Sequence, residues 1–289
     1  MAGTIDYWCN AFTPDYADRW ARAIELQGIP LKVRKESDDS FAAPGAFVAR
    51  MDELSIDRVL LPSTADPEAA AELEFEGFTT SAGEVRRLVA AHPGRFGGLW
   101  TIDPAAAFSA AQEASAVLRD PGFVGLHLHT HSWDRPFDHR DLYPFYAVAA
   151  EHGVPVVVQA GTSGGLMPSE CGRPIGIDRP ALYFPNVRFV LSHTGWPWGD
   201  EAIAMALKHP NVFLGTAAYP PRHWSFELVR FAAGPGRGKV LFGTSFPVVG
   251  HRHALTQIDE LKLSPAAKTA LLGGAARTVF TRLAAGGIS

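Results

Sequence analysis

A histidine at the end of a buried strand is the first residue in this sequence whose type and position suit chemistry. Residues 187–191 are almost all apolar and β-branched or aromatic, which is typical of a strand buried on both faces. His193 follows this run, and a helical pattern then begins at Asp200 and extends to Lys208. Because β/α units carry their chemistry at the carboxyl ends of strands, we predict that His193 is a general acid or base. An unperturbed imidazole has a pKa of about 6.5 and exchanges protons near neutrality.

Two further histidines, His127 and His129, occupy alternate positions at the end of another strand-like run. Side chains two residues apart in a strand point to the same side, so these imidazoles can act together as catalytic or binding groups. They could instead form a metal site with His131 or Asp134 as a third ligand. In the charge-dense loop that follows, Arg135 is either a surface ion-pair residue or a clamp for a substrate carboxylate.

These residues require a scaffold in which strands and helices alternate, and the sequence provides that pattern. Strands are predicted at 3–7, 58–62, 96–102, 123–128, 154–158, 187–191, 212–214 and 239–242. Helices are predicted at 18–26, 45–54, 82–91, 103–119, 143–152, 200–208, 226–232, 252–261 and 264–280. Eight such units favour a single (β/α)8 TIM barrel over residues 1–289, with an inserted region at about 10–55 after the first strand. The alternative, an open doubly wound sheet, lacks its glycine-rich phosphate fingerprint.

Composition excludes several classes of protein. The 289 residues carry a net charge of −4, which does not favour nucleic-acid binding. No apolar run approaches the roughly 20 residues that span a bilayer, and the N-terminus lacks the pattern of a signal peptide. Only Cys9 and Cys171 occur, so a disulfide framework is not expected. We therefore predict a cytoplasmic protein whose partner is a small-molecule substrate.

Several segments resemble the amidohydrolase-related family, in the branch that includes aminocarboxymuconate semialdehyde decarboxylase. The segments are SHTGWPWGDEAIAMALKHPNVFLGTAAY (192–219), KVLFGTSFP (239–247), LLGGAARTVF (271–280), IDYWCN (5–10) and GVPVVVQAGTSG (153–164). The resemblance implies a TIM barrel of the amidohydrolase type, a hydrolase or decarboxylase activity on small cyclic or aromatic carboxylates, and a homodimer.

The sequence departs from this family at its metal ligands. The family's first strand usually ends in Asp-x-His-x-His, but Trp8 and Asn10 stand in place of the two histidines. Gln159 replaces the fifth-strand histidine and Ser245 replaces the eighth-strand aspartate, so only His193 remains. Indole cannot ligate a metal, and neutral amide and hydroxyl oxygens bind transition metals weakly. We therefore expect no metal and no cofactor.

The preferred hypothesis is a metal-independent enzyme that uses His193, His127 and His129 as acid and base. Neutral hydrogen-bond donors would stabilise a developing oxyanion, and aromatic walls would hold a planar ring; the donors are Asn10, Gln159 and Ser245, and the walls Trp8 and Trp100. Ser245 or a backbone carbonyl is expected to orient His193. The reactions that fit are hydrolysis, decarboxylation, and dehydration or cyclisation of a carboxylate, lactone or β-keto compound. The alternatives are a metal-dependent hydrolase or decarboxylase with relocated histidine ligands, and a catalytically silent barrel that binds a ligand or partner.

Overall fold

The computed structural model describes residues 3–26, 41–65 and 79–285. Within them, parallel strands form one sheet in the order β1-β2-β4-β5-β6-β7-β8-β9, and the short β3 pairs only with β2. The strands are β1 Thr4–Asp6, β2 Ile56–Thr64, β3 Thr80–Ser81, β4 Phe96–Thr101, β5 Phe123–Leu128, β6 Val156–Gln159, β7 Phe189–Ser192, β8 Val212–Gly215 and β9 Val240–Leu241.

The sheet curves until its first and last strands meet. The backbone N–H of Tyr7, just after β1, donates to the carbonyl of Phe242 at 3.1 Å, and Cys9 forms a parallel bridge with Phe246. The eight strands other than β3 thus form a nearly closed barrel. The predicted (β/α)8 barrel is confirmed.

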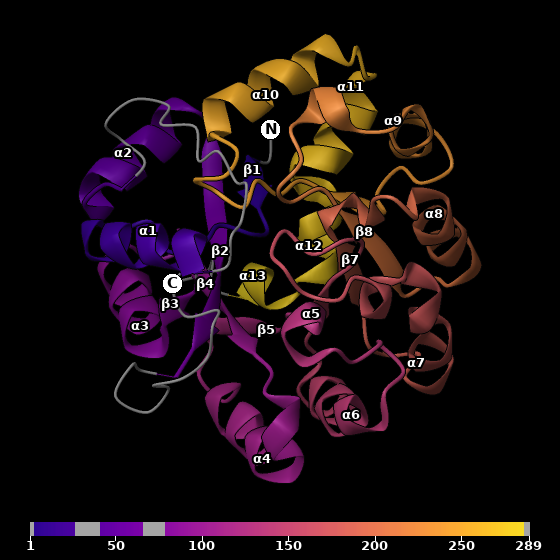
Figure 1. Ribbon diagram of the computed structural model, residues 1–289. Coiled ribbons are helices and arrows are strands. Elements are labelled where there is room, and N and C mark those ends of the chain that lie inside the picture. The colour runs from indigo at the N-terminus through magenta and orange to yellow at the C-terminus, as the bar shows by residue number, and fades with distance from the viewer. Residues whose placement is uncertain (1–2, 27–40, 66–78, 286–289) are drawn as a thin grey trace.

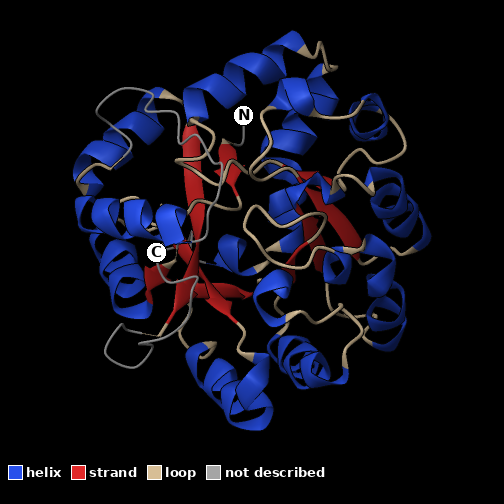
Figure 2. Cartoon of the chain, in the orientation of Figure 1, coloured by secondary structure: helices blue, strands red, loops and turns tan. Residues whose placement is uncertain are grey.

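Helices surround the barrel, as Figures 1 and 2 show. They are α1 Ala17–Leu26, α2 Pro44–Glu53, α3 Ala82–Ala91, α4 Ala107–Val117, α5 Thr130–Trp133, α6 Tyr143–His152, α7 Asp178–Tyr183, α8 Gly199–Lys208, α9 Phe226–Ala233, α10 His251–Glu260, α11 Pro265–Thr269, α12 Ala275–Val279 and α13 Arg282–Ala285. Within the described ranges, none of the helices is long and apolar enough to span a bilayer.

Alternation along the strands divides the buried side chains into two layers. On β6, Val156 and Val158 belong to the outer layer between the sheet and the helices, whereas Val157 belongs to the barrel interior. Phe280 and the apolar residues of α12 complete the interior cluster, and Figure 1 shows α12 and α13 inside the ring of helices. The C-terminal segment therefore closes one end of the barrel.

The predicted elements differ from the observed ones mainly at the C-terminus and in short segments. The helix predicted at 264–280 is divided into α11, a π-helical segment Ala270–Gly274, and α12. A side chain at Gly273 would meet the Gly3 carbonyl at 2.6 Å, so this turn lies against the first strand. Neither β3 nor the six-residue α7 was predicted. The proposed insertion contains α1 and α2, and its residues 27–40 lie outside the described residues.

Candidate active site

Trp8 stands at the centre of the candidate site, between two of the predicted catalytic histidines. Its indole ring makes edge-on contacts with His127, at 4.6 Å between ring centroids, and with His193, at 4.8 Å. Trp8 follows β1, His127 lies on β5, and His193 follows β7. The structure thus brings these three residues together, although they are far apart in sequence.

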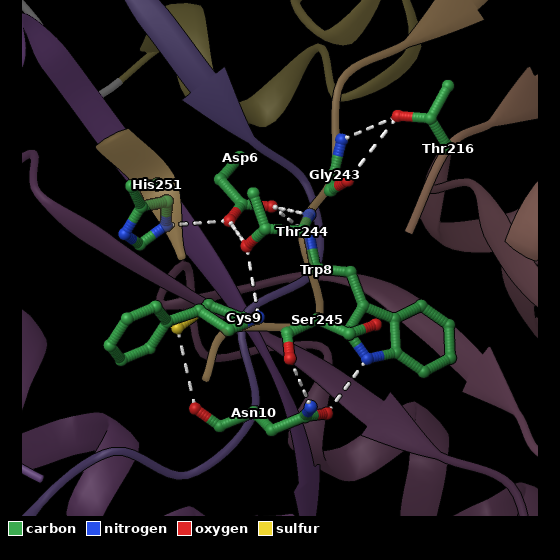
Figure 3. A network of polar contacts seen from close by, with 10 residues as sticks. Asp6, Trp8, Cys9, Asn10, Thr216, Gly243, Thr244, Ser245 and His251 are labelled. Carbon is green, nitrogen blue, oxygen red and sulfur yellow. Dashed lines mark hydrogen bonds and ion pairs between the residues drawn. The ribbon is translucent and has the colours of Figure 1, made fainter. Parts of the chain in front are cut away.

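The positions after β1 and after β9 where the family pattern has metal ligands are joined to each other. The Trp8 indole N–H donates to the Asn10 side-chain carbonyl at 2.9 Å, and the Asn10 amide donates to the backbone carbonyl of Ser245, also at 2.9 Å (Figure 3). The Ser245 hydroxyl is buried without a hydrogen-bond partner among the described residues. Gln159 ends β6, where it is paired in register with Ser192, and is 5% exposed. Ser245 therefore retains a free hydroxyl in the site.

The buried carboxylate of Asp6 forms hydrogen bonds with both segments of this network. It accepts hydrogen bonds from the backbone N–H of Trp8 at 3.0 Å, from the backbone N–H of Thr244 at 3.1 Å, and from the Thr244 hydroxyl. His251 of α10 contacts the same carboxylate at 2.8 Å through Nε2, as Figure 3 shows. Asp6 thereby ties the end of β1 to the segment after β9. These contacts of Asp6 were not predicted from the sequence, because no motif marks His251 as its partner.

Ser192, rather than Ser245 or a backbone carbonyl, orients His193. The Ser192 hydroxyl lies 2.9 Å from His193 Nδ1 and 2.5 Å from the phenol oxygen of Tyr7. His193 also has a positive φ of 62°, an uncommon backbone conformation for a residue other than glycine. Ser192 could have been suspected from its place beside His193, but nothing in the sequence pairs Tyr7 with it.

Burial makes the imidazoles of this site neutral. It lowers the pKa of His127 and that of His193 to about 3, and neighbouring histidines lower the pKa of His193 further. The pKa of His129 is also well below its ordinary value, through burial and then through His131, His127 and His193. The proton exchange near neutrality that is expected of an unperturbed imidazole therefore does not apply to these histidines. At neutral pH these residues offer N–H donors and nitrogen lone pairs without positive charge.

Each histidine of the β5 segment has one nitrogen committed to the protein. Thr101 on β4 lies 2.9 Å from His127 Nδ1, and Ser132 lies 2.6 Å from His129 Nδ1. His131 Nε2 lies 2.9 Å from the carbonyl of Gly161. His127 Nε2 and His131 Nδ1 are buried without hydrogen-bond partners among the described residues. Such orphaned polar atoms are costly unless a ligand or water satisfies them.

Two predicted substrate-binding residues lie away from this cluster. Trp100 belongs to the outer layer, where its ring contacts Phe123 edge-on at 6.1 Å, so it does not wall the barrel interior. Arg135 forms an ion pair with Asp141 at 3.0 Å and donates to the carbonyl of Trp133. The structure places Arg135 in an ion pair, the first of the two alternatives for that loop.

The donor set does not fit a divalent metal. The Trp8 indole occupies the centre of the cluster, and the Asn10 side-chain oxygen already accepts its N–H. Among the described residues, no group of three or more histidine, cysteine, aspartate or glutamate side chains is arranged to hold a metal ion. The relocated site on His127, His129 and His193 therefore has no supporting geometry in this part of the chain.

A sequence model of the family described as amidohydrolase matches residues 5–282. The chain belongs to the amidohydrolase family. The resemblance inferred from the motifs is thereby confirmed. Among proteins of curated function, none matches this amidohydrolase-family chain significantly.

Solved structures with the same fold cover nearly the whole chain. An uncharacterized TIM-barrel protein from Bordetella bronchiseptica is 22% identical, with a TM-score of 0.75, over 97% of this chain and 99% of its own. The 2,6-dihydroxybenzoate decarboxylase from Rhizobium is 16% identical (TM-score 0.67), and the 5-carboxyvanillate decarboxylase from Sphingomonas paucimobilis is 20% identical (TM-score 0.65). Both alignments cover 97% of this chain and 99% of the decarboxylase. At these identities the likeness establishes the amidohydrolase-type barrel.

Proposed function

We propose that this amidohydrolase-family protein is a metal-independent enzyme that decarboxylates a small planar carboxylate. The observation that carries the proposal is the Trp8 indole between His127 and His193, at the position where the family pattern has a metal ligand. An aromatic surface beside neutral hydrogen-bonding groups suits a flat, partly apolar ring that bears polar substituents.

The reaction would depend on hydrogen bonds to an oxygen on which negative charge develops. Loss of carbon dioxide from a carboxylate with a neighbouring carbonyl group breaks the C–C bond, and the electron pair moves onto that oxygen as an enolate. A neutral buried imidazole is a suitable donor to such an oxyanion, since its N–H needs no prior protonation. His193 is the proposed principal donor, and the unpartnered Ser245 hydroxyl is the second. The carbon then takes up one proton, so the carboxylate and a proton yield carbon dioxide and a C–H bond.

Two observations support an aromatic or cyclic carboxylate as the substrate. The solved structures that share this fold include decarboxylases of 2,6-dihydroxybenzoate and of 5-carboxyvanillate, both aromatic carboxylates. His127 Nε2, a buried atom without a partner among the described residues, offers an additional contact beside Trp8. A ring seated against the indole would place its substituents between His127 and His193.

The proposal is tested by assaying chelator-treated protein for carbon dioxide release. The substrates are 2,6-dihydroxybenzoate, 5-carboxyvanillate and a cyclic β-keto carboxylate, each with a protein-free blank. We expect turnover of at least one of them and a loss of roughly 100-fold or more in kcat for His193→Asn, because an oxyanion donor is removed. The exposed His223 provides the matched control, and His223→Asn should leave kcat unchanged.

Three outcomes would contradict the proposal. Turnover that appears only when manganese or zinc is added would favour a metal-dependent enzyme. Turnover by His193→Asn at the wild-type rate would remove the main catalytic assignment. Binding of all three carboxylates without turnover would favour the silent binding barrel.

A further inference from the structure

We infer that Tyr7 is a positioning residue that fixes His193 as a neutral Nε2–H donor, acting through Ser192. Its importance for turnover rests on the proposed function, whereas the proton arrangement can be measured without any substrate. Tyr7 lies beneath Trp8 in the barrel interior and is fully buried, as is Ser192.

The barrel interior is shaped to admit the Tyr7 phenol. A side chain at Gly215 would place its Cβ 2.1 Å from the phenol oxygen, and one at Gly243 would lie 2.4 Å from Cε1 of the same ring. Glycine at both positions lets the phenol cross from the end of β1 to β7, where it meets Ser192 at 2.5 Å. Packing and hydrogen bonding thus both place the phenol oxygen under His193.

The direction of each hydrogen bond follows from the proton inventory. Burial raises the pKa of Tyr7, so the phenol keeps its proton at neutral pH. The phenol oxygen accepts from the backbone N–H of Ala217 at 3.4 Å, and its own proton needs an acceptor. Ser192 Oγ is the acceptor within reach, so Tyr7 donates to Ser192. The Ser192 proton is then directed to His193 Nδ1, 2.9 Å away.

The series of hydrogen bonds from Tyr7 through Ser192 to His193 determines which imidazole nitrogen carries the proton. Because Nδ1 accepts from Ser192, the imidazole proton must reside on Nε2, the nitrogen free to meet a ligand. Protonation of Nδ1 would make Ser192 Oγ the acceptor of both hydrogen bonds and would deprive the buried Ser192 proton of its acceptor, His193 Nδ1. The chain therefore opposes the imidazolium form and keeps His193 as a neutral donor. The high pKa of Tyr7 also makes it an orienting group rather than a proton source.

The test is the tautomer of His193 in 15N-histidine-labelled, full-length protein, read from long-range 1H–15N NMR correlations at pH 7. The His193 signals are assigned by their loss in His193→Gln. In the wild type we expect an unprotonated Nδ1 and a protonated Nε2. In Tyr7→Phe and in Ser192→Ala we expect the two tautomers to mix, with the Nδ1 signal shifting toward its protonated value.

Another buried phenol supplies the matched control. Tyr146 is fully buried and donates to the carbonyl of Phe137 at 2.8 Å, remote from His193 in the outer layer. Tyr146→Phe removes an equivalent hydrogen bond and should leave the His193 signals unchanged. Where a substrate is turned over, Tyr7→Phe should lower kcat by roughly 10- to 100-fold with little change in KM, as removal of an orienting partner does. Tyr146→Phe should not lower kcat.

The inference is overturned if wild-type His193 carries its proton on Nδ1 or is an imidazolium at pH 7. Identical His193 signals in Tyr7→Phe, Ser192→Ala and the wild type would also overturn it. A failure to find any substrate would count against the proposed function alone, because the NMR result does not depend on turnover. If Tyr7→Phe does not fold, Ser192→Ala tests the same link.

Discussion

At the scale of single residues, Trp8 determines the environment of the histidines in the candidate site. It stands where the family pattern has a ligating histidine, and its ring packs edge-on against the buried His127 and the half-buried His193. Burial in this space makes the neutral imidazole the stable form, as the low pKa values of His127 and His193 show. The same burial that suits these groups to donate hydrogen bonds also makes the protein sensitive to acid.

Because of these histidines, the free energy of unfolding should decrease as the pH is lowered. The folded pKa of about 3 for His127 and for His193 is below the unfolded value of about 6.5, so the folded state binds fewer protons. Their contribution is fully present above pH 6.5 and is lost progressively down to pH 3. Each histidine should cost about 2 kcal/mol of unfolding free energy between pH 7 and pH 5.

Urea unfolding at pH 7 and at pH 5 measures this effect. The difference between the two pH values should shrink by about 2 kcal/mol in His127→Gln relative to the wild type. It should not change in His223→Gln, which alters an exposed side chain. An equal pH dependence in wild type and His127→Gln would show that His127 is not held neutral by burial.

Two elements far apart in the chain, the end of β1 and the segment after β9, depend on one carboxylate. Asp6 receives hydrogen bonds from Trp8 and Thr244 and contacts His251 of α10 (Figure 3). The contact is fully buried, so removing the carboxylate would leave several polar groups without compensation. Asp6 thus stabilises the join that closes the barrel and fixes the backbone on which Trp8 and Ser245 are carried.

Asp6→Ala should therefore cost about 3–5 kcal/mol of unfolding free energy. The control is Asp57→Ala, which breaks the exposed ion pair with Arg277 and should cost about 1 kcal/mol or less. Chemical denaturation of both variants provides the comparison. Losses of similar size would mean that Asp6 is not a structural hub.

Local patterns predicted elements well where one segment determines its own structure. The run 123–128 became β5, and the patterns at 82–91 and 143–152 became α3 and α6 with the same bounds. Asp103, at the start of the helix predicted at 103–119, caps a helical turn by accepting from the backbone N–H of Ala105. The helix predicted at 264–280 is interrupted because its turn at Gly273 meets the first strand, a contact that no local pattern reveals.

Long-range contacts explain what could not be predicted of the site. His127 and His193 were found from their place at strand ends, and the barrel brings both of them to Trp8. Strand alternation, counted from Thr101 facing His127, would have placed Trp100 on the outer side. The link between Tyr7 and Ser192 joins residues 185 positions apart and requires the folded barrel to be seen.

At the scale of the whole molecule, the barrel has the candidate site at one end. A C-terminal plug, formed by α12, Phe280 and Leu283, fills the other end. Phe280 and the apolar side chains of α12 pack into the interior cluster that also contains Tyr7 and Trp8. The residues of the candidate site and those of the C-terminal segment therefore pack in one continuous interior cluster.

Removing part of the plug should destabilise the whole fold. Phe280 is fully buried, so Phe280→Ala should cost about 3–5 kcal/mol of unfolding free energy. Phe108 on α4 is 73% exposed, and Phe108→Ala should change stability by about 0.5 kcal/mol or less. Thermal and urea unfolding of the two variants test the difference. Equal effects would show that the C-terminal segment does not support the barrel.

The metal content of the purified protein tests the central claim most directly. The protein would be expressed in medium containing zinc and manganese, purified without chelator, and analysed by plasma mass spectrometry. We expect far less than one ion per chain, because Trp8 occupies the centre of the site and the neighbouring donors are committed to one another. A ratio near one zinc or manganese ion per chain would contradict a metal-independent site and would make the histidines around Trp8 its first candidate ligands.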